Sequence, residues 1–347
     1  MSNYRKQDKG GWLFSAIEHQ QCVAKREIGI LKLRDIIDWE AFRALLEELC
    51  NYADRDWSKG GQPPFDPVFM FKVLILQKYH GLGDDATEEQ IGDRLSFQAF
   101  LGLQLGDDIP DAKTIWLFKE RIESEKREGS RRLFEAFTAL LEEKNIIARE
   151  GSIIDASFTE APRQRNSRDQ NRRIKKGERP EEFDANPATG RQKDTDARWT
   201  KKNGRNYYGY KNHAKVDLKS KLIIGSQTTS AEVHDSQVFK GLLDEKDQAV
   251  LTDSAYHSEE NERYVLEEID AEEFLMRKAH RNRPLGEEEK KTNHTISRMR
   301  VRVEHVFGRM AQMGADLCRS IGIRRATGHN HLCNLTYNMD RYAYLSR

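Results

Sequence analysis

Long apolar runs are missing from this 347-residue sequence. No run reaches the roughly 18 apolar residues of a membrane-spanning helix, so we expect no membrane association. Residues 1–14, MSNYRKQDKGGWLF, also lack the apolar core of a secretory signal. Cysteine is scarce, and its four residues form neither a CxxC pair nor a dense framework: Cys22, Cys50, Cys318 and Cys333. We therefore expect reduced thiols in a cytoplasmic protein.

Motifs for nucleotide cofactors are absent as well. The sequence has neither a glycine-rich phosphate-binding loop nor a dinucleotide-binding motif, so we expect no nucleotide cofactor. Hydrophobic residues make up 37% of the chain, which is enough for packed cores and argues against general disorder. The net charge is only +1, so the distribution of charge is more informative than its sum.

One segment, residues 163–179, is strongly basic. It holds eight basic and two acidic residues, a net charge of 8 − 2 = +6, and its only aliphatic residue is Ile174. We interpret it either as a solvated linker or as a flexible arm that neutralises DNA phosphates. Its candidate DNA-contacting residues are Arg163, Arg165, Arg168, Arg172, Arg173, Lys175 and Lys176.

Residues 1–150 have the apolar spacing of helices. Asp66 followed by Pro67 is a typical helix start, and the next residues are nearly all apolar until Gly81. The sequence TEEQ, residues 87–90, predicts a capping box for another short helix. Several short helices with tight turns predict a domain that reads DNA, forms a dimer interface, or is an ordinary helical bundle.

The helix expected after Asp111 is the strongest candidate for reading DNA sequence. Its apolar residues are expected to form a buried seam: Ile115, Trp116 and Phe118. Its basic residues are expected on the outside: Lys113, Lys119 and Arg121. An α-helix fits the major groove, and Arg can bond guanine twice, so we predict DNA contacts from Lys113 and Arg121.

After residue 150 the apolar period becomes that of strands. Residues 210–217 alternate between two faces, and DLKSK followed by LIIGSQTT predicts a hairpin. Further strands are expected at residues 248–253 and 272–276, with a last long helix from about residue 295 to residue 313. This order predicts a mixed α/β domain with one antiparallel pair.

Two of these strands are expected to end in an acid. Asp155 follows the apolar residues of GSIID, and Asp253 follows those of VLTD. Small residues come next in both places, so a bulky ligand has access. One such ending is common because Asp favours turns and helix starts, but two suggest a shared site.

A third acid, Glu304, lies in the last predicted helix. It is one residue past Val303, hence about 100° round the helix, at the border of the apolar seam. Arg300 is its neighbour one turn earlier. The alternative is an ordinary exposed glutamate, but the surrounding charged residues are all arginines, which favours a specific role.

Segments from nearly the whole chain resemble the DDE transposases of bacterial insertion sequences, in particular the insertion sequence five group. They are PFDPVFMFKVLILQKYHGL, IPDAKTIWLFKERI, SIIDASF, GYKNHAKVD, VHDSQ, LTDSAY and RVEHVFGRM. The resemblance implies a ribonuclease-H-like fold with Asp155, Asp253 and Glu304 as catalytic, metal-binding acids. Arg300 fits the family pattern, whereas Ser297 and Ala311 stand where relatives often have Tyr and Lys.

The expected chemistry suits three carboxylates. Two Mg²⁺ ions about 4 Å apart can activate a water and stabilise the leaving 3′ oxygen during DNA cleavage. Mg²⁺ prefers carboxylate and water oxygens, and Mn²⁺ can replace it. The three acids should then converge within roughly 8 Å of one another. The freed 3′-OH can next attack target DNA at the same site.

These inferences give a predicted organisation. Residues 1–150 are a helical N-terminal domain, residues 151–325 a ribonuclease-H-like catalytic domain with a basic insertion at 160–206, and residues 326–347 a C-terminal tail. The expected partners are double-stranded DNA, both terminal inverted repeats and target, and a second copy in an active homodimer. The alternatives are a nuclease that cuts without joining and a DNA-binding repressor without chemistry.

Several histidines have weaker signals. The sequence GHNHLC brings His329, His331 and Cys333 together, but a fourth zinc ligand is missing, which favours a structural role. Asp235 in VHDSQ is expected to cap a helix, and the role of His234 beside it is open. His305 adjoins Glu304 but points elsewhere on the helix, so a structural or DNA-facing role is expected.

Overall fold

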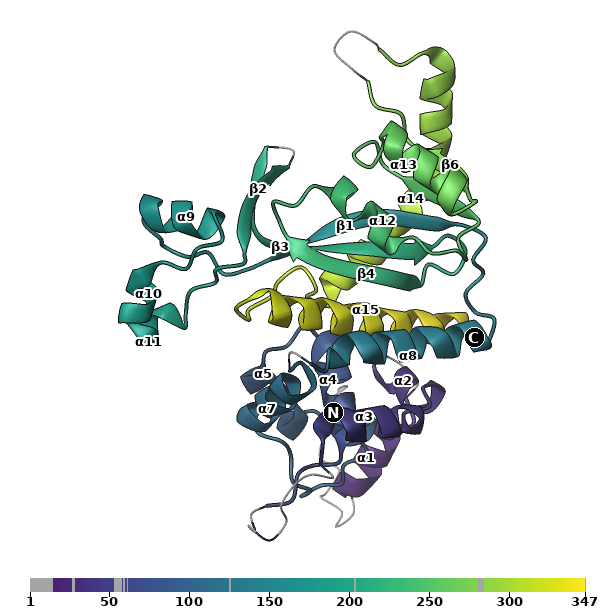
Figure 1. Ribbon diagram of the computed structural model, residues 1–347. Coiled ribbons are helices and arrows are strands. Elements are labelled where there is room, and N and C mark those ends of the chain that lie inside the picture. The colour runs from purple at the N-terminus through teal and green to yellow at the C-terminus, as the bar shows by residue number, and fades with distance from the viewer. Residues whose placement is uncertain are drawn as a thin grey trace, which may run out of the picture.

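The structure, a computed structural model, describes residues 15–26, 29–52, 58, 60, 62–124, 126–202, 204–279 and 284–346. Figure 1 shows a helical body, a sheet above it, and two long helices side by side between them. Those helices are α8 (Gly129–Glu143) and α15 (Ile323–Leu345). No helix in the described part of the chain is long and apolar enough to cross a membrane.

The helical body contains α4 (Pro67–Tyr79), which starts where the sequence predicts. The Asp66 carboxylate accepts hydrogen bonds from the Val68 and Phe69 N–H groups at 2.8 and 3.0 Å. Most side chains of α4 are buried. The other elements of the body are α1 (Ser15–Ala24), α2 (Leu31–Ile36), η1 (Glu40–Phe42), α3 (Arg43–Cys50), α5 (Asp84–Asp93), α6 (Leu95–Leu101) and α7 (Ala112–Ile122).

One helix start differs from the prediction. α5 begins at Asp84, with Gly83 at its N-cap, so the capping box predicted at residues 87–90 is wrong. Thr87 is buried instead, and its hydroxyl donates to the Gly83 carbonyl at 2.6 Å and accepts from the Gln77 amide at 3.0 Å. Because these bonds satisfy the hydroxyl inside the helix, it does not serve as a cap.

The described strands form a six-stranded mixed sheet in the order β2-β3-β1-β5-β6, and β4 pairs with β3. Their bounds are β1 Ser152–Glu160, β2 Arg198–Lys202, β3 Arg205–Asp217, β4 Ile223–Ser230, β5 Ala249–Thr252 and β6 Glu272–Leu275. The predicted hairpin of β3 and β4 is confirmed. The prediction of one antiparallel pair is wrong, because the long β3 pairs antiparallel with β1, β2 and β4. β5 runs parallel to β1 and to β6.

The basic segment 163–179 is folded, so the expectation that it lacks regular structure is wrong, while its contact with DNA stays a prediction. It contains α9 (Arg168–Lys175), which begins with a capping box between Ser167 and Gln170. Two short helices follow, α10 (Glu181–Ala185) and α11 (Pro187–Gly190). Ile174 is buried beside Trp199 and Tyr208. These apolar partners come from later in the chain, so the composition of the segment alone does not reveal its fold.

The C-terminal part of the chain is more helical than the sequence predicts. α14 (Glu287–Gln312) begins before the expected residue 295, and acidic residues fill its first turn, where they suit the helix dipole. Residues 326–347, expected to be a tail, lie mainly in α15, a 23-residue helix with many buried side chains. One hydrophobic core extends from the helical body into the sheet, and the domain boundaries near residues 150 and 325 stay predictions.

A row of asparagines joins α15 to the sheet. The Asn330 amide oxygen accepts from the Thr159 hydroxyl of β1 at 2.9 Å. One turn later, the Asn334 amide oxygen accepts from the Asn212 amide of β3 at 2.8 Å. Asn338 then accepts from the Ile223 N–H of β4 at 2.9 Å and donates to the carbonyl of the same residue at 2.7 Å. Three neighbouring strands are therefore bonded to one helix. We call these three residues the asparagine row.

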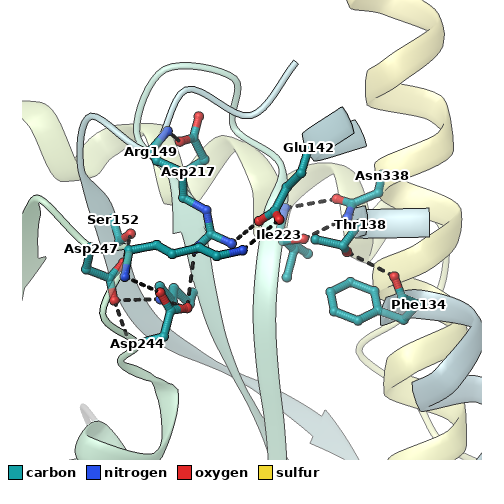
Figure 2. A network of polar contacts seen from close by, with 12 residues as sticks. Phe134, Thr138, Glu142, Arg149, Ser152, Asp217, Ile223, Asp244, Asp247 and Asn338 are labelled. Atoms are coloured by element: carbon teal, nitrogen blue, oxygen red, sulfur yellow. Dashed lines mark hydrogen bonds and ion pairs between the residues drawn. The ribbon is translucent and has the colours of Figure 1, made fainter. Parts of the chain in front are cut away.

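Short elements connect the strands on the other face. They are the 3₁₀ turn η3 (Asp235–Gln237), α12 (Phe239–Leu242), α13 (Glu259–Arg263) and the π-helical turn η4 (Tyr264–Glu268). A buried ion network holds the loop after α12 against β1 and β3 (Figure 2). Lys215 of β3 donates to Asp244 at 2.8 Å and to Asp247 at 2.6 Å, and the Ser152 hydroxyl donates to Asp247 at 2.7 Å. Arg149 extends the network to Glu142 of α8.

Removing the buried lysine from this network should destabilise the fold. The side chains of Lys215 and Asp247 are only 1% and 0% exposed, so Lys215→Ala leaves a buried carboxylate without its counter-charge. We expect a loss of about 3–5 kcal/mol in the free energy of unfolding, measured by urea denaturation. Lys219→Ala is the matched control, because its pair with Glu150 is exposed and is worth under about 1 kcal/mol. Equal losses in the two variants would contradict this role of the network.

Candidate active site

Two predicted site acids are neighbours in the sheet. β1 and β5 run parallel with Ile153 opposite Leu251 and Ile154 opposite Thr252. The next position of this register brings Asp155 beside Asp253, directly after β5 ends. We call Asp155 and Asp253 the acid pair. The side chains of residues paired in register point to the same side of a sheet, so the carboxylates share one environment.

Only one of these acids ends its strand. β5 stops at Thr252, one residue before the predicted end at Asp253, but β1 continues past Asp155 to Glu160, so the prediction that Asp155 ends a strand is wrong. β1 extends because every one of its residues is paired with β3, whereas β5 pairs only with its first part. Asp155 therefore lies inside β1, at the point where the pairing of β1 with β5 ends. This position opens its side chain to the space beyond the end of β5.

Local backbone bonds orient both carboxylates. The Ala156 N–H donates to Asp155 Oδ1 at 2.7 Å, and the Ala255 N–H donates to Asp253 Oδ1 at 2.9 Å. In each case one oxygen is used by the backbone, which leaves the second oxygen for another partner. The small residues after each acid keep the approach to these oxygens clear of bulky side chains.

Arg300 of α14 is the partner of that second oxygen on Asp155. Its Nη2 donates to Asp155 Oδ2 at 2.7 Å, and the two side chains are 15% and 17% exposed. Arg300 Nε is buried without a hydrogen-bond partner. Burial raises the pKa of Asp155, and Arg300 offsets only part of this effect. The site thus has a nearly buried acid whose negative charge is not fully balanced.

Glu304 is exposed on α14, one helical turn after Arg300. Residues four apart lie on one face of a helix, so Glu304 is on the same face of α14 as Arg300, the residue that bonds to Asp155. Within the described ranges, no three His, Cys, Asp or Glu side chains are arranged to hold a metal ion. The acid pair nevertheless fits a divalent cation in donor chemistry, because it offers hard carboxylate oxygens whose charge is under-compensated. Convergence of all three acids stays a prediction.

A second polar group lies behind the acid pair, and the sequence interpretation missed it. Asp235 does not cap a helix as predicted; it accepts from Lys211 Nζ at 2.8 Å, and the His234 ring occupies the cap position. His213, from the same face of β3, has its Nδ1 3.9 Å from Asp235, and burial lowers the pKa of His213 to about 4. The sequence signal for this group is that Lys211 and His213 are two residues apart in a predicted strand, so both side chains lie on one face of it.

Tyr256 is close enough to both polar groups for the charges of their acids to act on it. Its side chain is fully buried, and its hydroxyl has no hydrogen-bond partner. Burial raises the pKa of Tyr256, and the negative charges of Asp235, Asp155 and Asp253 raise it further. The hydroxyl therefore stays protonated, and its O–H group is an unused hydrogen-bond donor inside a site that is rich in acids.

The predicted DNA-reading helix, α7, differs in detail from its prediction. Ile115 and Phe118 are buried, but Trp116 is 42% exposed, so its place in a buried seam is wrong. The reason is that α7 lies at the surface of the body with only one side packed. Lys119 is paired with Asp84. Lys113 is exposed, and the Arg121 guanidinium lies 5.1 Å from the ring centre of Tyr52, whose hydroxyl it contacts at 3.0 Å.

The basic insertion lies beyond the β2 end of the sheet, on the side away from the first turns of α14 (Figure 1). Most of its predicted DNA-contacting residues are exposed: Arg163, Arg165, Arg168, Arg172, Lys175 and Lys176. Arg173 is half-buried and lies 3.6 Å from both Asp169 and Glu181. The structure therefore presents a basic surface on a folded unit.

The histidines of GHNHLC lie in the interior, whereas His305 lies at the surface. Lys78 Nζ donates to His329 Nδ1 at 2.8 Å, and Cys333 Sγ lies 3.6 Å from the other ring nitrogen. Burial lowers the pKa of His329 well below its usual value and that of His331 to about 4. His305 Nδ1 lies 3.2 Å from Lys221 Nζ at the surface.

Two family models match the chain. The model described as "Transposase DDE domain" matches residues 147–339, which include the acid pair, Arg300 and Glu304. The model described as "Transposase domain (DUF772)" matches residues 20–121, which include α7. No solved structure matches the chain.

Proposed function

The chain belongs to the DDE transposase family, a metal-dependent class of DNA-cleaving enzymes, and we propose from this that it carries out both cleavage and joining. It would cleave DNA at the ends of an insertion element and transfer the freed 3′-OH ends to target DNA. The observation that supports this most directly is the register that brings Asp155 beside Asp253, with Arg300 bonded to Asp155.

We assign the metal-binding role to Asp155, Asp253 and Glu304, with Mg²⁺ as the ion and Mn²⁺ as a substitute. Bound divalent ions would supply an activated water and stabilise charge on the leaving oxygen. Several residues of the chain are already arranged in a way that suits bound metal ions. Backbone N–H groups fix one oxygen of each acid in the acid pair, and Glu304 is one helical turn from Arg300. Arg300 is the cation next to Asp155 and is suited to a phosphate oxygen of the reacting strand.

The proposed partners are double-stranded DNA and a second copy of the chain. The terminal inverted repeats would be read by α7 through Lys113 and Arg121, while the insertion would contact phosphates. Two copies would hold the two element ends together in an active homodimer in the cytoplasm. A nuclease without joining activity, or a repressor without chemistry, is separated from this proposal by a strand-transfer assay with precleaved terminal-repeat ends.

Each of the three acids should be essential for cleavage. Asp155→Ala, Asp253→Ala and Glu304→Ala each remove a proposed metal ligand, and we expect a loss of about 10³-fold or more in cleavage rate, or about 4 kcal/mol. The affinity of each variant for terminal-repeat DNA should stay within about twofold of that of the unchanged protein. Glu288→Ala, an exposed glutamate in the first turn of α14, is the matched control. Full activity of Glu304→Ala would remove Glu304 from the site.

The insertion should contribute binding without sequence preference. Changing Arg172, Arg173, Lys175 and Lys176 to Glu should weaken binding to unrelated duplexes alike, since phosphate contacts carry no base information. The slope of log affinity against log salt should fall by about 0.9 for each phosphate that the protein no longer neutralises. Lys144→Glu, an exposed lysine after α8, tests the effect of charge change alone. An unchanged salt slope would remove the insertion from the DNA interface.

Arg121 should contribute sequence preference. Arg121→Ala is expected to reduce discrimination by about 1–3 kcal/mol at one base pair, as measured by competition with single-base variants of the terminal repeat. Lys126→Ala, exposed just after α7, is the control. The full chain must be used, because the hydrophobic core crosses residue 150. If the protein dimerises and both variants keep the same base preference, α7 serves assembly rather than recognition.

A further inference from the structure

The turn between β3 and β4 gathers positive charge that the proposed active site does not use. Arg302 of α14 donates from Nη1 to the Leu218 carbonyl at 2.6 Å, and Arg341 of α15 donates from Nε to the Ser220 carbonyl at 2.7 Å. The third cation, Lys221, belongs to the turn itself. Three segments that are far apart in the sequence therefore bring their cations to one turn. We call Lys221, Arg302 and Arg341 the cation cluster.

The cation cluster has no negative partner in the protein. Among the residues that the structure describes, none of its three members forms an ion pair with a carboxylate. Lys221 Nζ lies 3.2 Å from His305 Nδ1, and a lysine can only donate, so its partner is a neutral imidazole nitrogen. Arg302 is exposed, and the other two cations are half-buried, so an anion can reach all three.

Two acids adjoin the cation cluster in sequence, but both are bonded elsewhere. The Asp217 carboxylate accepts from the Arg149 N–H at 2.9 Å (Figure 2) and from the Ser220 hydroxyl at 2.6 Å. The Asp340 carboxylate accepts from Arg309 Nε at 2.9 Å. The charge of the cluster therefore stays uncompensated. A group of like charges without a counter-charge indicates an anionic ligand.

Lys221 is held in the cluster against two unfavourable effects. Its φ of 62° lies in the left-handed region, which costs a residue with a side chain about 1–2 kcal/mol. Burial lowers the pKa of Lys221, and the positive charges of Arg341 and Arg302 lower it further. A glycine at this position would avoid both the strain and the repulsion. Backbone strain and unfavourable electrostatics at one residue are typical of a position that serves a ligand.

The positive surface continues from the cluster along α14. Arg298, His294 and Lys291 precede Arg302 at intervals of four, four and three residues, so they share one face of the helix. All of them are exposed. After the first turn of α14, Glu304 is its only acid. The row is about 16 Å long at 1.5 Å per residue, which exceeds a small anion and suits the repeated phosphates of a DNA strand.

The cation cluster is separate from the acid pair. Arg302 follows Arg300 by two residues, so its side chain points about 200° further round α14. Arg300 accordingly bonds to Asp155, whereas Arg302 bonds to the turn. The body of α14, about 10 Å across with its side chains, therefore lies between the two sites. An anion at the cluster would be a different group from one at the acid pair.

We propose that Lys221, Arg302 and Arg341 bind a backbone phosphate of DNA on the flank of α14 opposite to the acid pair. The proposal rests on the proposed function in taking DNA as the ligand, and it adds a site for a phosphate that is not cleaved. The ligand is a phosphodiester rather than a base, because the site offers uncompensated positive charge. It therefore contributes affinity for any duplex, whatever its sequence.

The test uses a combined variant of the full chain, Lys221→Gly with Arg302→Gln. Glycine suits the φ of residue 221, so this change should not destabilise the fold. Glutamine at residue 302 retains an N–H donor for the Leu218 carbonyl while it removes the charge. The midpoint of thermal unfolding in chloride should therefore equal or exceed that of the unchanged protein. A lower midpoint would mean that the cluster stabilises the fold, which would contradict the proposal.

The matched control combines Lys219→Ala with Lys246→Ala. It removes the same number of positive charges from exposed lysines whose charges are already paired, with Glu150 at 2.7 Å and with Glu142 at 3.0 Å. Lys219 also lies in the same turn as the cluster. A difference between the two combined variants therefore reports on the cluster and not on net charge.

Binding to a terminal-repeat duplex and to an unrelated duplex is measured by fluorescence anisotropy without added metal. The cluster variant should bind both roughly fivefold more weakly in about 100 mM salt, with a slope of log affinity against log salt reduced by about 0.9, the value for one phosphate. The loss should be the same for the two duplexes. The control should keep the slope of the unchanged protein. Equal slopes in the two combined variants would overturn the proposal.

A measurement without DNA separates this proposal from the proposed function. Pyrophosphate, compared with chloride at equal ionic strength, should raise the midpoint of thermal unfolding more in the unchanged protein than in the cluster variant. Equal shifts would mean that the cluster binds no anion, and the proposed function would stand. If pyrophosphate distinguishes the two proteins but duplex binding does not, the ligand is a free phosphate ion and the DNA assignment is wrong. A protein that binds no duplex at all would overturn the proposed function as well.

Discussion

The buried hydrogen bonds of the asparagine row determine how the two halves of the molecule meet. A side-chain amide without a partner in the interior costs about 1–3 kcal/mol, so each asparagine restricts α15 to the register in which its partner is present. Because the row bonds to β1, β3 and β4, it sets the position of the helix against three strands at once. Apolar side chains of α15 pack into the same core as the helical body. The sheet and the helices therefore cannot shift independently.

The fixed position of the sheet against the helices also holds the residues of the candidate site in place. Strand pairing fixes the distance between Asp155 and Asp253, and α14 contributes Arg300 from a different layer. Burying Asp155 raises its pKa, which costs stability at neutral pH, and Arg300 offsets that cost incompletely. Sites prepared for a charged ligand commonly retain such unfavourable electrostatics in the free protein. The unpaired hydroxyl of Tyr256 is a second example in the same place.

Local signals in the sequence predicted local features well. Asp66 and Pro67 start α4, and the alternating residues of β3 form the predicted hairpin with β4. Features that depend on distant partners were missed. Asp155 continues into a longer strand because β3 pairs with it, and Ile174 finds its apolar neighbours beyond residue 196. For the site, the adjacency of the two aspartates follows from sequence, while the bond of Arg300 to Asp155 required the fold. The polar composition of α15 is typical of an exposed tail, and only the fold shows that its asparagines are bonded to the sheet.

The position of α15 also has a consequence for biosynthesis. This helix is the last element described, yet it fills the space between the sheet and the helical body. A ribosome makes α15 after every other described element, so the apolar surfaces that α15 covers stay exposed in the growing chain until α15 has been made. Packing of the sheet against the helical body therefore waits for the synthesis of α15. A product that stops before α15 would leave apolar surfaces of the sheet and of the helical body exposed, which favours aggregation and proteolysis.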